Sequence, residues 1–447
     1  MNRDLLRDLS AALAAALLVV AAALVGAAIK REKDTLHVGL PPLYANWGPH
    51  VGPGTPAALA VAVAVVAYGP VLAARLPWRG LLYAVWGTGT AWTFSLALVD
   101  GWHRGIARRL TTSYEYLQVI DRFDDIPGTL RDFTNHILID SPDHWPAHIA
   151  GHPPGATLTF VLLDRIGLGG GAWAGVFVIT VGATAGAAIL VTVRALAGEA
   201  LARRAAPFLV LAPAAVWAGT SADGYFAAVA AWAVAFLALA VTGHRPRLTG
   251  LASGLLFGLT LYLSYGLTLF AVIACAVLLL GSRRVRPLPY VLLGLAVVPA
   301  AFTLAGFNWW EAYHLLVERY YQGAGGFRPY GYWVWANLAC TVLVVGPATV
   351  AGLRRAGAAP VRARVRTCLR TPGAAAETRL ALLVLGALLA LLVADLSGMS
   401  KAETERIWLP FAMWLLAAGA FVTRPRAWLA AQAVLALLLN HLLLTGW

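Results

Sequence analysis

The run "LSAALAAALLVVAAALVGAAI", from Leu9 to Ile29, contains no charged side chain. A helix needs about 20 apolar residues to cross the hydrocarbon core of a bilayer. Charged residues precede the run, and no convincing cleavage site follows it. We therefore interpret it as a retained membrane helix rather than a signal peptide.

Similar apolar runs recur along all 447 residues. The chain is 60% hydrophobic and 12% charged, with a mean hydropathy of +0.72, whereas soluble domains carry about 25% charged residues. The composition predicts an all-α, polytopic membrane protein with roughly thirteen transmembrane helices and amphipathic helices outside them. The expected spans are about 9–28, 57–75, 82–99, 172–193, 206–218, 222–241, 248–262, 266–281, 287–305, 332–352, 379–395, 407–421 and 427–444.

The net charge of +13 comes from short arginine clusters between these runs. This pattern fits the positive-inside bias better than nucleic-acid binding, so no nucleic-acid partner is expected. All the clusters fall on one side if the N-terminus is cytoplasmic and the stretch 154–167 lies along the outer interface. The C-terminus is then outside. Lys30, Arg31 and Lys33 are an exception on the outer side.

The outer connections, chiefly 100–153, hold most of the polar residues. In "DHWPAHIAGHPPG" (143–155), His144, His148 and His152 are spaced four apart, but Pro146 and Gly151 disfavour a continuous helix and a metal site. We interpret His144 and His148 as ordinary loop histidines. His152 is either a capping residue at a helix start or a hydrogen-bond donor to a ligand.

Carboxylates near the membrane surface are candidates for a general base. Asp100 ends the third span, and Glu115 stands between two tyrosines in "TSYEYL". Asp121 follows in "IDRFDD", beside Asp124 and Asp125, which we interpret as a solvated turn. Asp223 lies in the short outward turn "GTSADGYF", where either Ser221 or Asp223 could cap the next helix.

Three cations lie on the outer side, against the positive-inside bias: Arg328, Lys401 and Arg406. Arginine binds phosphate through two parallel hydrogen bonds, so an anionic ligand is a natural partner. The alternative is ion pairing, for example between Arg406 and Glu403 or Glu405.

The order of these motifs resembles the GT-C superfamily of membrane glycosyltransferases, which use polyprenyl-phosphate sugars. His152-Pro153-Pro154 is similar to the "HPP" segment of that superfamily, Asp223 to its acid in a later outward turn, and "RIWLP" (406–410) to its late basic motif. The resemblance covers roughly 82–422. The pair of adjacent acidic residues that usually follows the first span of that superfamily has no clear match here, so Glu115, Asp100 and Asp121 all remain candidates for the catalytic acid of the resemblance.

The resemblance implies an inverting transferase in the plasma membrane, with its active site on the outer face. A sugar would move from a polyprenyl phosphate to an envelope glycan or glycolipid. Glu115 is the first choice as base, His152, Asp223, Arg328, Lys401 and Arg406 would bind substrate, and no metal or cofactor is expected. Residues 1–81 and 423–447 would flank the catalytic module 82–422.

Three other functions remain open. A transporter or flippase for a lipid-linked or anionic substrate is the main alternative, although it would place charges at the bilayer midplane. An inactive scaffold protein and an acyltransferase with His152 as base are the others.

The arginine pattern makes a topology prediction. Single cysteines introduced near positions 130 and 400 should react with an impermeant thiol reagent in intact cells. Cysteines near position 365 should react only after permeabilisation. Outward labelling of the 353–378 loop would contradict the topology.

Overall fold

The computed structural model describes residues 3–363 and 376–446, and its ordered elements are almost all helices. The first part of the chain forms α1 (Arg3–Glu32), β1 (Ala45–Trp47), α2 (Thr55–Arg75), α3 (Trp78–Ala97), η1 (Leu98–Asp100), η2 (His103–Ala107), η3 (Arg109–Thr111), η4 (Tyr116–Phe123), α4 (Ile126–Asp132), η5 (Phe133–His136), α5 (Ala147–Ala150) and α6 (Gly155–Arg165).

The middle part forms α7 (Gly170–Gly182), α8 (Thr184–Ala197), α9 (Glu199–Val210), α10 (Ala215–Ala218), α11 (Ala222–Thr242), α12 (Pro246–Leu263), η6 (Tyr265–Leu269), α13 (Phe270–Leu280) and α14 (Leu288–Leu304). The last part forms α15 (Trp309–Gln322), α16 (Ala324–Phe327), α17 (Tyr330–Ala363), α19 (Ala376–Leu396), α20 (Thr404–Ile407), α21 (Leu409–Leu415), η7 (Leu416–Phe421), α22 (Pro425–Leu442) and β2 (Leu443–Thr445).

The expected spans fall mainly on helices, except that 206–218 is broken at residues 211–214, between α9 and α10. The helices also differ in length. Among the described residues, six helices are long and apolar enough to cross a membrane: Arg3–Glu32, Thr55–Arg75, Gly170–Ala197, Ala222–Thr242, Tyr330–Ala359 and Ala376–Leu396. A seventh is added if α14 and α15, bent by 78°, form one span. The all-helical membrane architecture is confirmed. The number thirteen is not established, because several apolar helices are shorter than a bilayer crossing.

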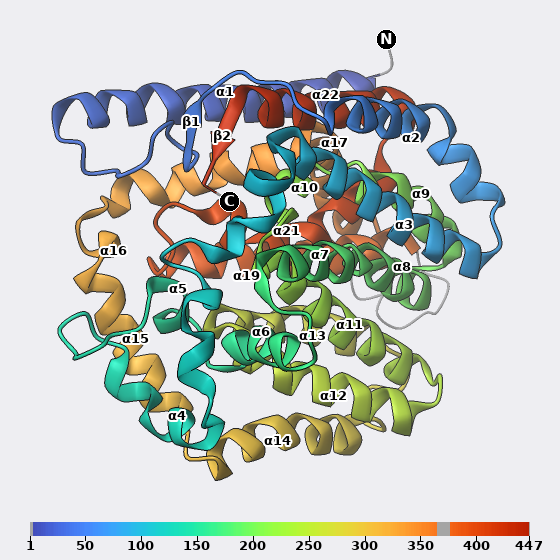
Figure 1. Cartoon of the computed structure of the whole chain (residues 1–447). Helices are drawn as coiled ribbons and strands as arrows, with labels where there is room; N and C mark the ends of the chain where they lie inside the picture. The colour runs from blue at the N-terminus through green and yellow to red at the C-terminus, as the bar shows by residue number, and fades with distance from the viewer. Residues whose placement is uncertain (1–2, 364–375, 447) are drawn as a thin grey trace.

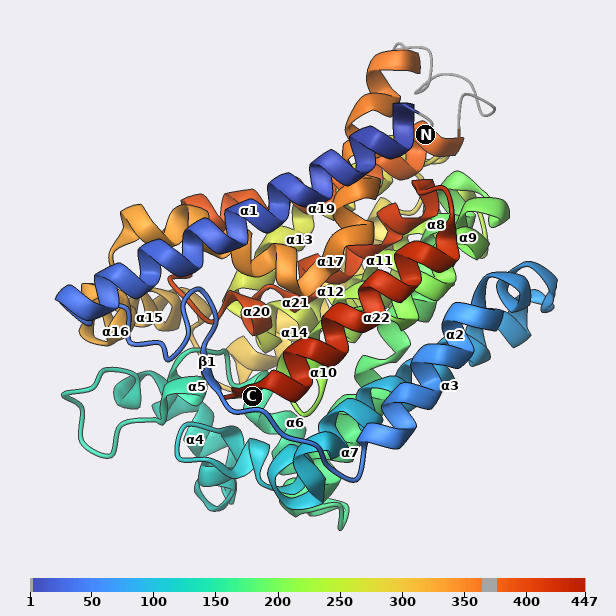
Figure 2. The same cartoon turned by 90° about the horizontal axis from the view of Figure 1, so that it is seen from above.

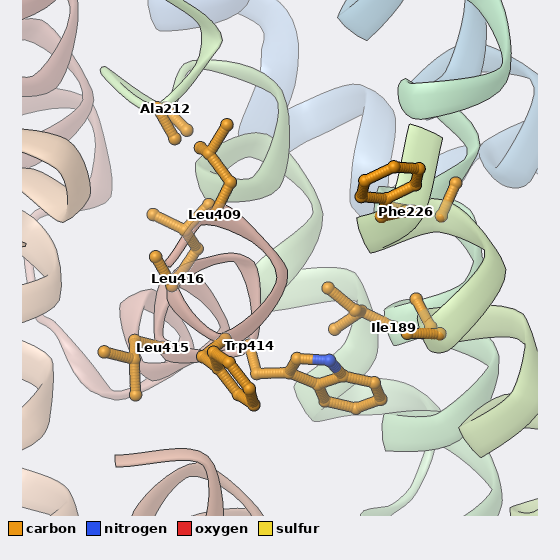
Figure 3. Packing of buried hydrophobic residues seen from close by; sticks show 14 of the residues in the cluster. Ile189, Ala212, Phe226, Leu409, Trp414, Leu415 and Leu416 are labelled. Atoms are coloured by element: carbon orange, nitrogen blue, oxygen red, sulfur yellow. The ribbon is translucent and has the colours of Figure 1, made fainter. Parts of the chain in front are cut away.

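The long helices lie side by side and run in one general direction (Figures 1 and 2). Helix α11 lies in the core, where 83% of the residues in its most apolar stretch are buried. Helix α1 lies on the outside, and only 11% of the residues in its corresponding stretch are buried. The close view in Figure 3 shows Ile189 of α8, Phe226 of α11 and Trp414 of α21 packing together. Helices α1 and α22 also pack into this bundle, against α17. The three expected parts, 1–81, 82–422 and 423–447, therefore share one helical body.

Two sets of contacts define the opposite ends of the bundle. At the first, the arginine end, Arg203 donates to Ala73 O and Leu76 O, and Arg379 donates to Leu196 O and Leu280 O. At the second, the loop end, lies the segment 100–153 with its short helices (Figure 2). The arginine clusters thus gather at one end, as expected, although residues 364–375 with Cys368 lie outside the described part of the chain.

The chain termini lie at these opposite ends. Asp8 near the start of α1 pairs with Arg354 and Arg355, each at 2.6 Å. β2 pairs antiparallel with β1, Ala45 opposite Thr445, and Thr445 O accepts from Arg109 Nη1 at 3.0 Å. The C-terminal strand therefore belongs to the loop end.

Helix α6 stays at the loop end over its 11 residues. Its last residue, Arg165, donates to the carbonyls of Phe123 and Asp124 at 2.9 and 3.0 Å. Its first residue, Gly155, packs on Tyr262, where α12 ends. Both ends of α6 thus contact the same end of the bundle, as expected for the stretch 154–167.

Asp8 has an exposed side-chain fraction of 0%, and the two arginines beside it are about one fifth exposed. Asp8→Ala should lower the free energy of unfolding by about 2 kcal/mol or more, since it removes both ion pairs and leaves the two arginines without this shared carboxylate. Denaturation in mixed detergent micelles measures the loss. Glu32→Ala, at an exposed position of the same helix, is the control and should change little.

Candidate functional site

Five side chains from distant parts of the sequence meet at the loop end: Glu115, His148, His152, Asp223 and Arg406. We call them the polar cluster. They come from the segment before η4, from α5 and the turn after it, from the first turn of α11, and from α20. Glu115, Asp223 and Arg406 are buried, with exposed fractions of 6%, 4% and 4%.

Arg406 lies at the centre of the polar cluster. Its Nη1 donates to Asp223 Oδ2 at 2.8 Å, and its Nη2 lies 3.2 Å from His148 Nε2. Glu403 is farther away, with its Oε2 3.8 Å from Nη2. The ion pairing expected for Arg406 is therefore present, but its main partner is Asp223 rather than Glu403 or Glu405.

His148 connects Arg406 to Glu115. Its Nδ1 lies 2.9 Å from Glu115 Oε1, while its Nε2 faces the guanidinium. A guanidinium can only donate, so Nε2 is the acceptor and Nδ1 carries the proton that points at Glu115. The imidazole therefore lies between the guanidinium and the carboxylate and contacts both.

Glu115 is held in its charged form. Burial alone would raise the pKa of this carboxyl, but the contact with His148 and the charge of Arg406 hold the pKa below its ordinary value. Its second oxygen, Oε2, is buried and has no hydrogen-bond partner among the described residues. Glu115 thus offers a desolvated carboxylate oxygen.

Tyr116 next to it is fully buried, and its hydroxyl also has no hydrogen-bond partner among the described residues. Burial and the nearby charges of Asp223 and Glu115 raise the pKa of Tyr116, so its phenol stays protonated. The Tyr116 hydroxyl is therefore a second buried polar group close to the polar cluster.

His152 is enclosed by aromatic rings, with centroid distances of 5.8 Å to Tyr116 and 5.7 Å to Phe226. Its Nδ1 donates to His148 O at 2.7 Å. Burial lowers the pKa of His152 to about 4, so the ring is neutral and its Nε2 can only accept. The donor role expected for His152 is corrected: this ring can accept a hydrogen bond from a hydroxyl.

Local sequence explains how Asp223 is placed. Ser221 is the N-cap of α11, and its hydroxyl accepts from Asp223 N at 3.2 Å. The same hydroxyl donates to Asp223 Oδ2 at 3.2 Å. Ser221 therefore caps the helix, and this leaves the Asp223 carboxylate directed at Arg406.

Arg328 and Lys401 have other partners. Arg328 donates to Leu36 O and Lys401 O at 3.2 and 2.8 Å and pairs with Glu403 at 3.3 Å. Lys401 Nζ donates to Gly325 O at 2.8 Å. Both cations hold loops together at the loop end, and no contact joins either one to Glu115 or Asp223 among the described residues.

The other two candidate bases lie apart from the polar cluster. Asp100 binds Arg109 at 2.8 Å and His50 at 3.0 Å, with Arg104 at 3.9 Å. Because Arg109 also binds Thr445 O, Asp100 secures the C-terminal strand. Asp121 is exposed. Of the three carboxylates predicted as candidates, the structure brings Glu115 alone into contact with the polar cluster.

His148 is the residue that sequence reasoning missed. It was interpreted as a loop histidine, yet it bridges Glu115 and Arg406. The available signal was its spacing of four from His152 in "HIAGH", which a single helical turn brings together. Helix α5 is such a turn, ending at Gly151, as Pro146 and Gly151 suggested. No group of three or more His, Cys, Asp or Glu side chains in the described residues is arranged to hold a metal ion.

Comparison with known proteins does not assign a family. No protein-family model matches the chain, and no curated protein matches its sequence significantly.

The low pKa of His152 makes a stability prediction. The unfolded histidine takes up a proton near pH 6.5, whereas the folded one resists protonation down to about pH 4. Thermal stability should therefore fall as the pH drops from 6.5 to 4. The fall should be shallower in His152→Gln, measured as the melting temperature against pH. The exposed His144→Gln should follow the wild type; parallel curves for wild type and His152→Gln would contradict the prediction.

Proposed function

We propose that this protein is an inverting glycosyltransferase of the GT-C type. It transfers a sugar from a polyprenyl phosphate to a hydroxyl of an envelope glycan or glycolipid at the outer face of the plasma membrane. In this proposal the shorter and bent apolar helices complete about thirteen membrane crossings. The loop end is then the extracytoplasmic end.

The observation that carries the proposal is the ionised, buried Glu115, whose Oε2 has no hydrogen-bond partner among the described residues. A desolvated carboxylate beside a guanidinium suits a reaction that removes a proton and generates a phosphate. Its position at the end of the bundle suits substrates from two phases, one a lipid and one arriving from outside. Polar groups at helix ends, rather than at the midplane, favour transfer over transport.

The reaction balances without a further reactant. Glu115 Oε2 takes the proton of the acceptor hydroxyl. The acceptor oxygen attacks the anomeric carbon of the donor from the side opposite the phosphate. The bond from that carbon to the phosphate oxygen breaks, and its electron pair leaves with the polyprenyl phosphate. The configuration at the anomeric carbon is inverted.

In the proposed reaction, Arg406 links the position of the donor phosphate to the base Glu115. A donor phosphate shares the guanidinium with Asp223, which holds it at 2.8 Å in the unliganded protein. Phosphate neutralises part of the charge that depresses the pKa of Glu115, so donor binding makes Glu115 a stronger base. His152 Nε2 accepts from a sugar or acceptor hydroxyl.

The base is tested by Glu115→Gln, which keeps the shape and removes the charge. Turnover should fall about 10²-fold or more, the range for loss of a general base, while the donor lipid still binds. Transfer of labelled sugar from a synthetic polyprenyl phosphate measures turnover. Asp124→Asn, at an exposed carboxylate of the same segment, should remain active. Full activity of Glu115→Gln would contradict the assignment.

The phosphate contact is tested by Arg406→Lys, which keeps the charge and loses the paired donors. Donor-lipid affinity in detergent should weaken by about 1–3 kcal/mol. Arg319→Lys, at an arginine that donates to Trp145 O outside the polar cluster, is the control. Equal affinities for wild type and Arg406→Lys would limit Arg406 to its ion pair with Asp223.

A further inference from the structure

A cavity lies at the loop end, outside the polar cluster. Its volume is about 510 Å³. Its wall is formed by the end of α1, the connection between α1 and β1, residue Arg104 of η2, and the C-terminal strand β2. We call it the α1 pocket. Among its lining side chains are Lys30, Asp34, His37, Tyr44, Asn46 and Arg104.

Among the described residues that line the α1 pocket, positive charge exceeds negative charge. Lys30 and Arg104 are cationic, and Asp34 is the one carboxylate in this described lining. Lys30 Nζ donates to Gly39 O at 2.8 Å, which is a neutral partner. This contact does not offset the ammonium charge and leaves two further donor hydrogens on Nζ.

Arg104 is a surplus cation in its own network. The nearest carboxylate, Asp100, lies 3.9 Å from Arg104 Nε, but Arg109 and His50 already bind it at 2.8 and 3.0 Å. The Arg104 side chain is 43% exposed, so the guanidinium can reach a ligand in the pocket. Arg109, which satisfies Asp100, is 11% exposed and cannot do the same.

The wall of the α1 pocket is firmly built. β1 and β2 pair across it, Ala45 opposite Thr445. Gly39 lies so close to the backbone of β1 that a Cβ at this position would come within 2.3 Å of Ala45 O. Asp34 and His37 are held at positive φ, 44° and 51°, a backbone conformation that costs free energy in side chains other than glycine. The connection is therefore fixed in a shape that its own local preferences disfavour.

The polar cluster does not offer such a surplus. There two carboxylates, Glu115 and Asp223, face the one guanidinium of Arg406. At the loop end, the α1 pocket thus has the charge that suits an anion. An anion in this pocket would also explain why Lys30, a cation, lies at the loop end, against the positive-inside bias.

We propose that the α1 pocket binds a phosphate group carried by a small hydroxylated molecule, with Arg104 and Lys30 as its charged contacts. The polar side chains of Asn46 and Tyr44 also line the pocket, on the side where the hydroxyl groups would lie. The phosphate belongs either to a lipid head group or to a soluble phosphoester. Exposed apolar residues near the end of α1, such as Leu24 and Val25, leave a path from the lipid. This inference does not require glycosyl transfer.

One hydrogen bond connects the wall of the α1 pocket to the helix that carries Arg406. Tyr44 N donates to Glu405 Oε1 at 2.8 Å, and Glu405 is the neighbour of Arg406 in α20. Glu405 is fully buried, and burial raises its pKa. A ligand that shifts the 34–47 connection therefore acts on the helix that carries Arg406.

Binding to the full-length protein tests the inference. Protein in maltoside is titrated with sn-glycerol 1-phosphate, and protein in phosphatidylcholine nanodiscs is compared with and without phosphatidylglycerol. Calorimetry or the shift in melting temperature reports binding. Saturable binding of glycerol phosphate indicates a soluble phosphoester, and a response to phosphatidylglycerol alone indicates a lipid head group; either result supports the proposal.

Three variants locate the site. Arg104→Gln and Lys30→Gln should weaken binding at least about tenfold, because each removes a charged contact. Lys30→Gln also removes the hydrogen bond to Gly39 O and could alter the connection between α1 and β1. Arg104→Gln leaves that hydrogen bond intact, so weaker binding by this variant reports the loss of a ligand contact. Lys33→Gln, at an exposed cation three residues beyond Lys30, should bind as the wild type does. Absence of binding of both probes to the wild type, or an equal loss in Lys33→Gln and Arg104→Gln, would overturn the proposal.

Discussion

The guanidinium of Arg406, buried between Asp223 and His148, is the interaction on which the loop end depends. An isolated charge in the interior costs several kcal/mol, and it is tolerated only when partners and hydrogen bonds compensate it. Here Asp223 supplies the direct ion pair, and Glu115 supplies a second charge through His148. Three segments that are far apart in sequence must meet for this balance to exist. Helix α11, α20 and the 100–153 segment are thereby held in one arrangement.

The same balance gives the site its chemistry. Arg406 and His148 hold the pKa of the buried Glu115 carboxyl below its ordinary value, and in the proposed reaction a donor phosphate competes with Asp223 for the guanidinium. A charge that stabilises the unliganded protein can in this way be transferred to a substrate. The neighbouring α1 pocket is different, since among its described lining residues two cations, Lys30 and Arg104, face one carboxylate, Asp34. The loop end therefore combines an ion-paired polar cluster with an adjoining pocket whose described lining carries more positive than negative charge.

Much of the fold could be predicted from the sequence, because apolar runs separated by arginines determine helices and their ends. Most expected spans fall on helices, with 206–218 broken at residues 211–214, and α6 does stay at one end. The sequence did not show where helices break. Gly346 interrupts α17 at a φ of 75°, and Gln432 of α22 repairs the break by donating to Val345 O at 2.9 Å. Such a repair depends on a partner 87 residues away.

The site was predicted in part. Residue type and position at the membrane surface identified Glu115, His152, Asp223 and Arg406. The roles of Asp100, Arg328 and Lys401 could not be separated from them, because a charge on a loop looks the same in sequence whether it binds a substrate or a backbone carbonyl. His148 was missed for the converse reason: its importance comes from its two neighbours in space and from no feature of its own.

The coupling of Glu115 to Asp223 through Arg406 is measured most directly by a double-mutant cycle. The free energies of unfolding of Glu115→Gln, Asp223→Asn and the double variant are compared with the wild type in one detergent. The two carboxylates compensate the same guanidinium, so the double variant should lose at least about 1 kcal/mol more than the sum of the single losses. Losses that add to within about 0.5 kcal/mol would contradict a single coupled cluster at the loop end.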